Sequence, residues 1–268
     1  MASARNAHSP AKSRVAGSGD SRNIRRAFAI FELLLAEGEP LSVAEMIARL
    51  RIPKSTFYEL VRTLTETGYL ERADRGGGLF LGRRLFELGM AYRARTDLLR
   101  DGAPIVEALR DATGETAQLS VLDADNMLVL LKEEGSQPLR IISKVGSRVP
   151  PNWAAAGRLL ISDLDDTQLI ELLHKTTAQS PSGQAVTDIE TLAAQVRKYR
   201  KRGYATELNE ANLHAGCVAA PVVDASGRCV AAISVVAPEQ RLGRTNRQRL
   251  IDEVRKAAAR LSNRLGGP

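Results

Sequence analysis

Two groups of residues carry side chains whose types and spacing could do chemistry. Lys54, Ser55 and Thr56 follow Pro53 near the predicted start of a helix, where a cation and two hydroxyls could contact phosphate oxygens. His214 and Cys217 stand three positions apart, so an imidazole could accept the proton of a thiol. The first group predicts binding to a polyanion, and the second raises the alternative of a cysteine-dependent enzyme.

The elements around Lys54 have the pattern of a winged helix-turn-helix. Residues 41–64 read as two short amphipathic helices joined by a tight turn, with a capping box of Ser42 and Glu45 at the start and Pro53 in the first turn of the second helix. After Gly68, a strand-like segment over 69–72, a Gly-rich tip over 75–78 and a returning segment over 79–81 predict a wing. Such a helix can enter the major groove, so residues 21–82 are predicted to bind DNA.

The polar side of the second helix is predicted to face the groove. Its candidate residues are Lys54, Ser55, Thr56, Tyr58, Glu59 and Arg62, and Arg72 or Arg75 on the wing would add phosphate contacts. Glu59 has two interpretations, because it could accept a hydrogen bond from a cytosine amine or pair with Arg62 along the helix flank.

The enzyme alternative lacks a complete site. No third residue that could orient His214 is identifiable, and a cysteine at the start of a strand is commonly a small apolar core residue. Two residues at His-x-x-Cys spacing do not make a tetrahedral metal site, and Asp163, Asp165 and Asp166 read as helix-capping acids. The sequence therefore favours a protein that is not an enzyme and that needs no metal or other cofactor.

Composition and charge favour a two-domain protein that acts on nucleic acid. The chain has 268 residues with 44% apolar side chains; residues 1–100 hold 17 Lys and Arg against 11 Asp and Glu, and residues 101–268 hold 21 against 20. Residues 1–20 are predicted to be a disordered basic tail. Two cysteines, no long apolar run and no signal-peptide core predict a cytoplasmic protein without a membrane partner.

The second half of the chain predicts a mixed α/β domain. Residues 83–103 are predicted as a linker helix that Gly102 and Pro104 end, and residues 104–265 as a sensing and oligomerisation domain. Strands are expected over 115–122, 127–131, 139–145, 217–223 and 229–236. Helices are expected over 154–162 and 167–173, from a cap at Thr187 to Gly203, and at the C-terminus.

Several motifs, in order, resemble the IclR family of bacterial transcriptional regulators. They are Pro53-Lys-Ser-Thr56, Gly68-Tyr69-Leu70, Leu81-Gly82, Thr113-Gly-Glu-Thr116, Val145-Gly146-x-Arg148-x-Pro150, Ala155-Ala-Gly157, Arg202-Gly-Tyr204, Cys217-Val-Ala-Ala-Pro221 and Ala232-Ile-Ser234, spread over roughly residues 22–240. The resemblance implies an α+β, two-domain fold, in which a linker helix joins a winged helix-turn-helix to a GAF-like effector-binding domain. It also implies dimers that pair into tetramers. Phe57, Tyr58 and Glu59 depart from the family's usual residues, so the operator sequence does not carry over.

By resemblance, a small-molecule effector would bind in the second domain. The predicted lining residues are Ile141, Ala155, Ala156, Glu207, Cys217 and Ser234, and an organic or aromatic acid is the expected effector. Trp153 could stack on an aromatic effector, or it could pack in the core or at a subunit contact. The expected function is a repressor of a double-stranded DNA operator, and a ligand-independent architectural DNA binder is a further alternative.

Overall fold

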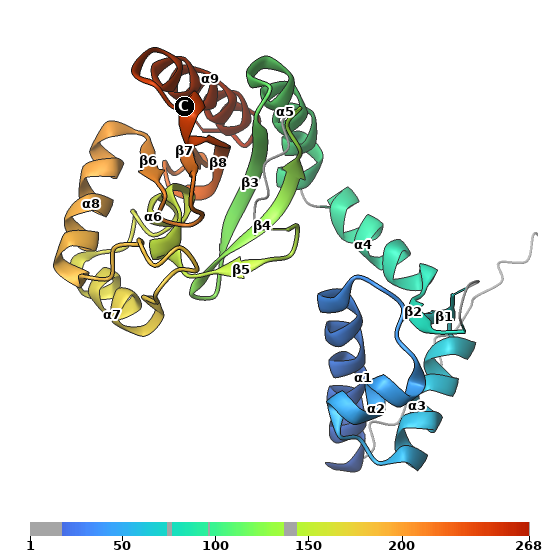
Figure 1. Cartoon of the computed structure of the whole chain (residues 1–268). Coiled ribbons are helices and arrows are strands. Elements are labelled where there is room, and N and C mark those ends of the chain that lie inside the picture. Colours follow the sequence, from blue (N-terminus) through green and yellow to red (C-terminus); the bar gives the residue numbers. More distant parts are fainter. Residues whose placement is uncertain (1–17, 74–76, 96, 137–143, 268) are drawn as a thin grey trace, which may run out of the picture. The chain divides into compact units, whose positions relative to one another are not determined.

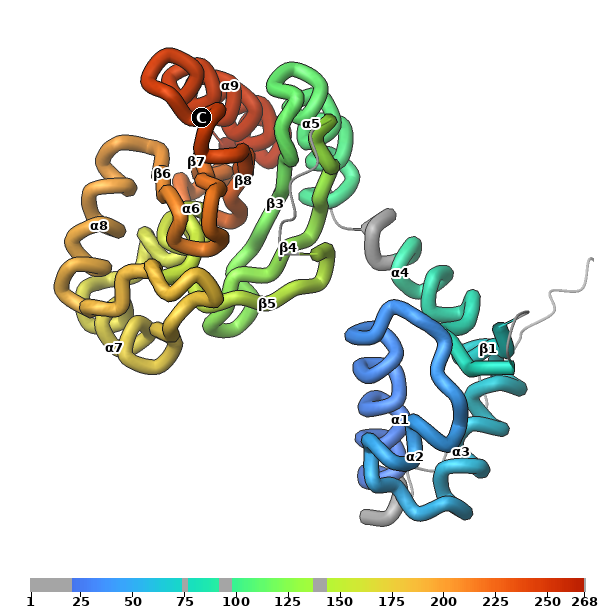
Figure 2. Tube along the Cα trace, viewed as in Figure 1, coloured from blue at the N-terminus to red at the C-terminus, as the bar shows by residue number. Residues whose placement is uncertain are grey.

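The computed structural model forms two compact units, residues 1–92 and 93–268 (Figures 1 and 2). The structure describes residues 18–73, 77–95, 97–136 and 144–267. The tail predicted over residues 1–20 lies outside this part up to residue 17, and Ser18 already begins a helix. No helix in the described ranges is long and apolar enough to cross a membrane.

Three helices and a two-stranded ribbon make up the N-terminal unit (Figure 1). The helices are α1 (Ser18–Glu37), α2 (Val43–Leu50) and α3 (Lys54–Glu66), and strands β1 (Leu70–Arg72) and β2 (Leu79–Leu81) form the ribbon. Their apolar faces share one core, which contains Ile30, Leu34, Met46, Phe57, Val61, Leu70 and Leu79. The winged helix-turn-helix predicted from the sequence is therefore the observed fold of this unit.

Local capping explains where α2 and α3 begin and end. The Ser42 hydroxyl accepts from the Glu45 N–H and the Glu45 carboxylate accepts from the Ser42 N–H, which confirms the predicted capping box. Arg51 ends α2 in the left-handed conformation, with φ of 53°. Pro53 precedes α3 as its N-cap rather than lying in its first turn as predicted, because its ψ of 135° is extended.

The wing is an antiparallel ribbon in which Leu70 pairs with Leu81 and Arg72 with Leu79. Leu41 adds a single bridge to Leu79, so the ribbon is joined to the segment that precedes α2. Gly68 has a φ of +76°, a conformation that glycine adopts without the steric cost of a side chain. The chain can therefore turn sharply from α3 into β1. Arg75 in the predicted tip lies outside the described residues.

Two helices occupy the region predicted as one linker helix. They are α4 (Arg83–Arg95) and α5 (Asp97–Thr113), and Gly102 and Pro104 lie inside α5 instead of ending a helix. A Cβ at Gly102 would lie 2.8 Å from Leu119 Cδ2, so glycine here allows close packing and is no stop signal. The break predicted at these residues is therefore wrong, and the limits of the linker and the sensing domain stay predictions.

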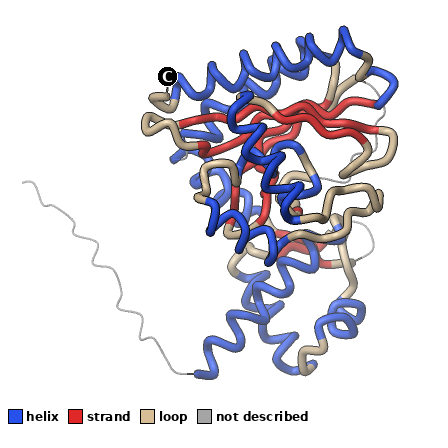
Figure 3. Tube along the Cα trace, turned by 90° about the vertical axis from the view of Figure 1, so that its left-hand side faces the viewer, coloured by secondary structure: helices blue, strands red, loops and turns tan. Residues whose placement is uncertain are grey.

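The C-terminal unit is built on a six-stranded antiparallel sheet with strand order β5-β4-β3-β8-β7-β6. The strands are β3 (Thr116–Asp123), β4 (Asn126–Glu133), β5 (Arg148–Val149), β6 (Ala205–Leu208), β7 (Ala215–Val223) and β8 (Cys229–Pro238). Helices lie on both sides of this sheet, as the turned view shows (Figure 3). Both faces of β7 and β8 are therefore largely buried.

Alternate residues of the sheet belong to two separate cores. One face, which includes Val218, Ile233 and Val235, packs against α5 and α9 (Arg244–Arg264). The other face, which includes Cys217, Ala219 and Val236, packs against α6 (Ala155–Leu160). Helices α7 (Asp166–Thr176) and α8 (Ile189–Arg202) form a further small core beside it, and two short 3-10 helices, η1 (Pro151–Trp153) and η2 (Glu239–Arg241), complete the unit.

Three details of this unit differ from the sequence predictions. The predicted strand 139–145 lies mostly outside the described residues, and Lys144 and Val145 are not in a strand. Strand β6 was not predicted, because four residues carry too little alternation to be recognised. Asp188, not Thr187, caps α8 by accepting from the Thr191 N–H at 2.9 Å, while Gly203 ends that helix in the left-handed conformation as expected.

Candidate functional site

Helix α3 presents a polar N-terminal turn to solvent. Lys54 and Ser55 are exposed and Thr56 is half-buried, whereas Phe57 in the same turn is fully buried. Pro53 makes no side-chain capping hydrogen bond, and the first turn contains no acidic residue. The backbone N–H groups of this turn and the positive end of the helix dipole are thus available to an anion, in contrast to the capped start of α2.

The other predicted groove residues of α3 lie on the same exposed side. Tyr58, Glu59 and Arg62 are exposed, and the Tyr58 side chain is 58% accessible to solvent. Within the described part of the chain, no ion pair joins Glu59 to Arg62, and both interpretations of Glu59 stay predictions. Arg72 on β1 is exposed as well, so the helix and the wing both offer cations.

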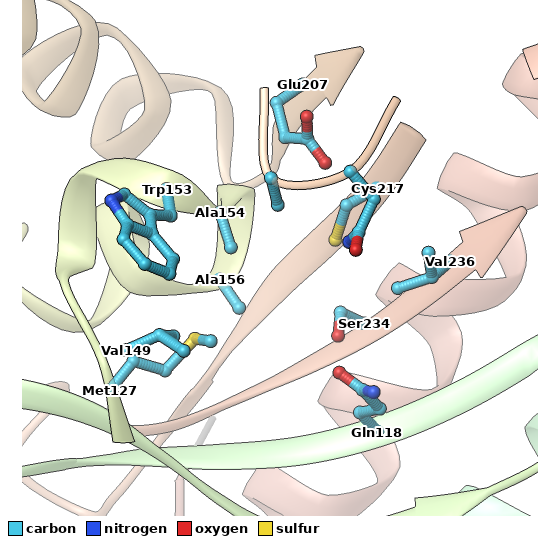
Figure 4. A pocket seen from close by; sticks show the side chains of 12 residues that line it. Gln118, Met127, Val149, Trp153, Ala154, Ala156, Glu207, Cys217, Ser234 and Val236 are labelled. Carbon is cyan, nitrogen blue, oxygen red and sulfur yellow. The ribbon is translucent and has the colours of Figure 1, made fainter. Parts of the chain in front are cut away.

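A cavity of about 50 Å³ lies in the C-terminal unit on the face of the sheet that α6 covers (Figure 4). Its lining consists of Gln118, Met127, Val149, Trp153, Ala154, Ala156, Glu207, Ala211, Asn212, Cys217, Ser234 and Val236. A single water needs roughly 10–15 Å³, so this space is large enough for a small organic molecule or a few waters.

Strand register brings the polar lining residues together. Glu207 pairs with Cys217 and Cys217 with Val236, which puts these three side chains in one row across β6, β7 and β8. Gln118 pairs with Ser234 in a neighbouring row across β3 and β8. Directly paired residues of an antiparallel sheet point to the same face. Residues as far apart in the sequence as Gln118 and Val236 therefore line the same cavity.

The structure places most of the predicted effector residues at this cavity. Glu207, Cys217, Ser234, Ala156 and Trp153 line it. Ala155 is fully buried at the start of α6 without being part of the lining, and Ile141 lies outside the described residues. Their role in binding stays a prediction.

Several lining residues were missed from the sequence. Gln118 is one of them, although the alternation of Ala117, Leu119 and Val121 already put it on the opposite face of its strand. Ala211 and Asn212 belong to the loop between β6 and β7, and no pattern in the sequence marks that loop as part of a site.

Glu207 is the one residue with a carboxyl group in the described lining, and it is only 8% exposed. Burial raises the pKa of Glu207 to about 7, against the opposing effect of a 3.0 Å hydrogen bond that its Oε2 accepts from the Glu210 N–H. Figure 4 shows this carboxyl group directed into the cavity near Cys217. A protonated Glu207 could donate a hydrogen bond to a ligand, and an ionised one could accept.

A buried ion pair lies next to Glu207. The Arg158 side chain on α6 is fully buried, and it pairs with Glu210 through both of its terminal nitrogens. Its Nη2 also donates to the Asn152 carbonyl at 2.8 Å. The charge of Arg158 is therefore balanced by Glu210, and no described lysine, arginine or histidine forms an ion pair with Glu207.

The Cys217 and His214 pair does not form a catalytic arrangement. Cys217 is buried in the lining, and burial, followed by the neighbouring Glu207 charge, raises the pKa of its thiol above the ordinary value. The His214 side chain is 80% exposed and lies 3.9 Å from Glu239. A thiol that stays protonated is a weak nucleophile, and the histidine faces solvent instead of serving as its base.

No group of three or more His, Cys, Asp or Glu side chains that could hold a metal ion occurs among the described residues. Asp165, one of the acids interpreted as caps, does cap a helix: it accepts from the Gln168 N–H at 2.9 Å. Asp163 instead accepts from the Cys229 N–H and pairs with Arg200. The acids near residue 165 thus have structural partners.

Trp153 forms part of the cavity wall and is fixed in its orientation. Its indole Nε1 donates to the Ala178 carbonyl at 3.0 Å, and the preceding Asn152 side chain donates to the same carbonyl at 3.0 Å. In Figure 4 the ring stands beside Met127 and Val149. Trp153 is therefore both packed and in a position to contact a ligand, so the two interpretations from the sequence are compatible.

A close backbone contact between η1 and α6 fixes the cavity wall that carries Trp153 and Ala156. A Cβ at Gly157 would lie 2.5 Å from the Pro151 carbonyl oxygen and 2.7 Å from its Cα. Only glycine permits this approach without a shift of the backbone. The segments that carry Trp153 and Ala156 are thereby held close together.

Both units match known family models. The model described as the IclR helix-turn-helix domain matches residues 24–74, and the one described as the bacterial transcriptional regulator IclR C-terminal domain matches residues 90–263. Among curated proteins, the chain is 28% identical over 239 residues to the HTH-type transcriptional regulator KdgR of Dickeya chrysanthemi, with 88% of this chain and 78% of that protein covered. It is 27% identical to the HTH-type transcriptional repressor AllR of Klebsiella pneumoniae, with 91% and 89% covered.

Solved structures share the fold. The IclR protein of Thermotoga maritima superposes with a TM-score of 0.78 at 24% identity, covering 92% of this chain and 99% of that one. An IclR homologue of Microbacterium hydrocarbonoxydans, crystallised in complex with 4-hydroxybenzoate, superposes with a TM-score of 0.80 at 24% identity, covering 91% and 98%.

Proposed function

The chain belongs to the IclR family of bacterial transcriptional regulators, and on that premise we propose that it is a repressor whose affinity for its operator is controlled by a small organic acid. Membership of this family means that the chain is a DNA-binding regulator and not an enzyme. Repression, the class of effector and the residues that act are the proposed part. As a regulator of bacterial genes it would work in the cytoplasm.

The main observation that supports these DNA-binding residues is the uncapped N-terminus of α3. Lys54, Ser55 and Thr56 would contact the phosphate backbone, helped by Arg72 on the wing and by Arg75, which lies outside the described residues. Tyr58, Glu59 and Arg62 would face the base edges, where an exposed carboxylate such as Glu59 could accept from a cytosine amine.

An exposed apolar stripe supports a homodimer on a palindromic operator. Ile24, Phe28 and Leu35 on α1 are 55%, 59% and 59% exposed, and they recur at helical spacing. On α4, Phe86 is 68% and Met90 43% exposed. Apolar patches of this kind on a protein in water mark interaction sites, so we propose that α1 and α4 bury them against a second copy, and that dimers pair further into tetramers.

The cavity around Glu207 is the proposed effector site. Its walls are mainly apolar and a few polar groups converge on it, which is the usual form of a small-molecule site. The relative bound to 4-hydroxybenzoate is consistent with an aromatic or other organic acid as ligand. Residues 83–103, which comprise α4 and the start of α5, would transmit the response, because helices are stiff enough to convert a change in one unit into a shift of the other.

A binding assay on genomic fragments tests this proposal. The full-length protein is incubated with DNA from upstream of its own gene and the neighbouring genes, in excess random competitor, with and without a panel of organic acids. We expect retention of one upstream fragment and release by at least one acid. Fragment binding that no acid changes would support the architectural alternative, and absence of any preferred fragment would overturn the proposed function.

A further inference from the structure

The charge arrangement around Glu207 bears on how an acid could bind there, an inference that rests on the proposed function of the cavity. Among the described lining residues Glu207 is the only one with an acidic or basic side chain, so no lining Lys, Arg or His awaits a carboxylate. A ligand carboxylate placed beside Glu207 would meet a second carboxyl group. Two carboxylates in such a site cannot both stay ionised at small cost, and they share one proton.

The cations near Glu207 are already engaged. Arg158 on α6 is paired with Glu210 and bonded to the Asn152 carbonyl. Arg247 on α9 lines a second hollow with Glu207, but its guanidinium donates to the Leu242 carbonyl through Nε at 3.2 Å and Nη2 at 3.1 Å. Neither side chain lines the cavity itself.

The remaining groups that face Glu207 also disfavour a second negative charge. Glu210, in the loop after β6, is an anion, and Cys217 on β7 is a thiol whose pKa is raised. The Glu210 and Ala211 N–H groups oppose this effect by stabilising the ionised carboxylate. Burial outweighs them, and the resulting pKa of about 7 means that protonating Glu207 costs little near neutral pH.

We propose that Glu207, in its protonated form, holds the effector, so that this site selects small carboxylic acids and binds them together with one proton. The proton comes from solvent when Glu207 is ionised beforehand. The Glu207 O–H then donates to one oxygen of the ligand carboxylate, and Ser234, which lies in the lining, is a further polar group within the same space.

Matched acid and amide probes test the proposal by calorimetry on the full-length protein. The probes are lactate with lactamide, and 4-hydroxybenzoate with 4-hydroxybenzamide, each titrated at pH 6 and pH 8.5 in two buffers of different ionisation enthalpy. We expect acid affinity to fall roughly tenfold for each pH unit above 7, with close to one proton taken up at pH 8.5 and much less at pH 6. The amides should show no such proton uptake.

The variant Glu207→Gln separates this role from a structural one. A neutral amide cannot titrate, so acid binding by the variant should be independent of pH, should take up no proton, and should exceed that of the wild type at pH 8.5. Exposed Glu171 on α7 supplies the control Glu171→Gln, which should keep the wild-type pH dependence.

Three results would overturn the inference: equal acid affinity at pH 6 and 8.5 without proton uptake, a pH dependence that survives in Glu207→Gln, or binding of the amides alone. Failure of all four probes to bind would overturn it as well. Each of these leaves operator binding by the ligand-free protein intact, whereas loss of operator preference would instead contradict the proposed function.

Discussion

The N-terminal turn of α3 and the cavity around Glu207 handle charge in opposite ways. Lys54 is an exposed cation at an uncapped helix end. Glu207 is 8% exposed, and its charge state near neutral pH depends on what lies beside it. A permanent surface charge suits a polyanion that is always charged, while a buried titratable group can respond to the ligand it meets.

The largest expected effect comes from removing Arg158, the buried cation beside the cavity. Arg158→Met leaves Glu210, whose side chain is 15% exposed, without its cationic partner, and we expect a loss of about 3–5 kcal/mol in the free energy of unfolding. Urea unfolding followed by Trp153 fluorescence reports the C-terminal unit, because Trp153 is the only tryptophan of the chain.

Two matched variants control that measurement. Arg197→Met removes a pair with Asp166 whose side chains are 47% and 78% exposed, and it should cost less than about 1 kcal/mol. Replacing Arg158 and Glu210 together by apolar residues should recover most of the lost stability. Equal losses for the two arginine variants would mean that burial does not distinguish these pairs.

The next largest effect concerns pH. The pKa of Glu207 is raised to about 7 in the folded chain from 4.5 when unfolded, so this group stabilises the fold below pH 4.5 and loses that contribution as the pH rises to 7. The loss is on the order of 3 kcal/mol. Glu207→Gln should flatten the slope of unfolding free energy between pH 5 and 8, measured by the same fluorescence.

The control for pH is the exposed Glu171→Gln, for which the wild-type slope should persist. Other titrating groups act equally in both proteins, so the difference between the two slopes isolates Glu207. A slope that Glu207→Gln leaves unchanged would show that Glu207 is ionised in the folded protein at neutral pH.

A smaller effect is expected at the surface site. Lys54→Ala should weaken binding to all DNA sequences by roughly eightfold at 0.1 M salt and reduce the salt slope by about 1, because one phosphate contact is lost. Fluorescence anisotropy over a salt series measures both. Exposed Lys198→Ala on α8 is the control, and a Lys54→Ala slope as steep as that of the wild type would place Lys54 away from the DNA backbone.

The smallest effect tests the contrast between capped and uncapped helix ends. Ser42→Ala removes the hydroxyl that accepts from the Glu45 N–H, and α2 should lose about 1 kcal/mol of local stability. Hydrogen exchange of the α2 amides measures this loss. Ser42→Asp keeps an acceptor and should retain protection, so similar losses in both variants would contradict the capping role.

These two regions also differ in how much of them could be predicted from the sequence. The residues of the α3 site are nearly consecutive, so helical periodicity and the capping box of α2 sufficed to predict their exposure. The cavity depends on pairing between β3, β6, β7 and β8, which periodicity within one strand does not determine. Glu207, Cys217 and Ser234 were named through family resemblance, while Gln118 and Asn212 were missed.

The errors have local physical reasons. Gly102 and Pro104 read as stop signals, yet both lie inside α5, where Gly102 lets the helix pack closely against the Leu119 side chain. Thr187 and Asp188 can both cap a helix, and only backbone geometry decides between them. Strand β6, which carries Glu207, is too short to show a pattern.

The close approach of Gly157 to Pro151 has a consequence for how such regulators diversify. Any larger residue at position 157 would force apart the two segments that carry Trp153 and Ala156, because a Cβ would lie 2.5 Å from a carbonyl oxygen. The shape of the proposed effector cavity is thus set in part by the absence of a side chain at Gly157, a residue outside the cavity lining. A substitution at such a position could therefore change which compounds fit the cavity without altering any residue of its lining.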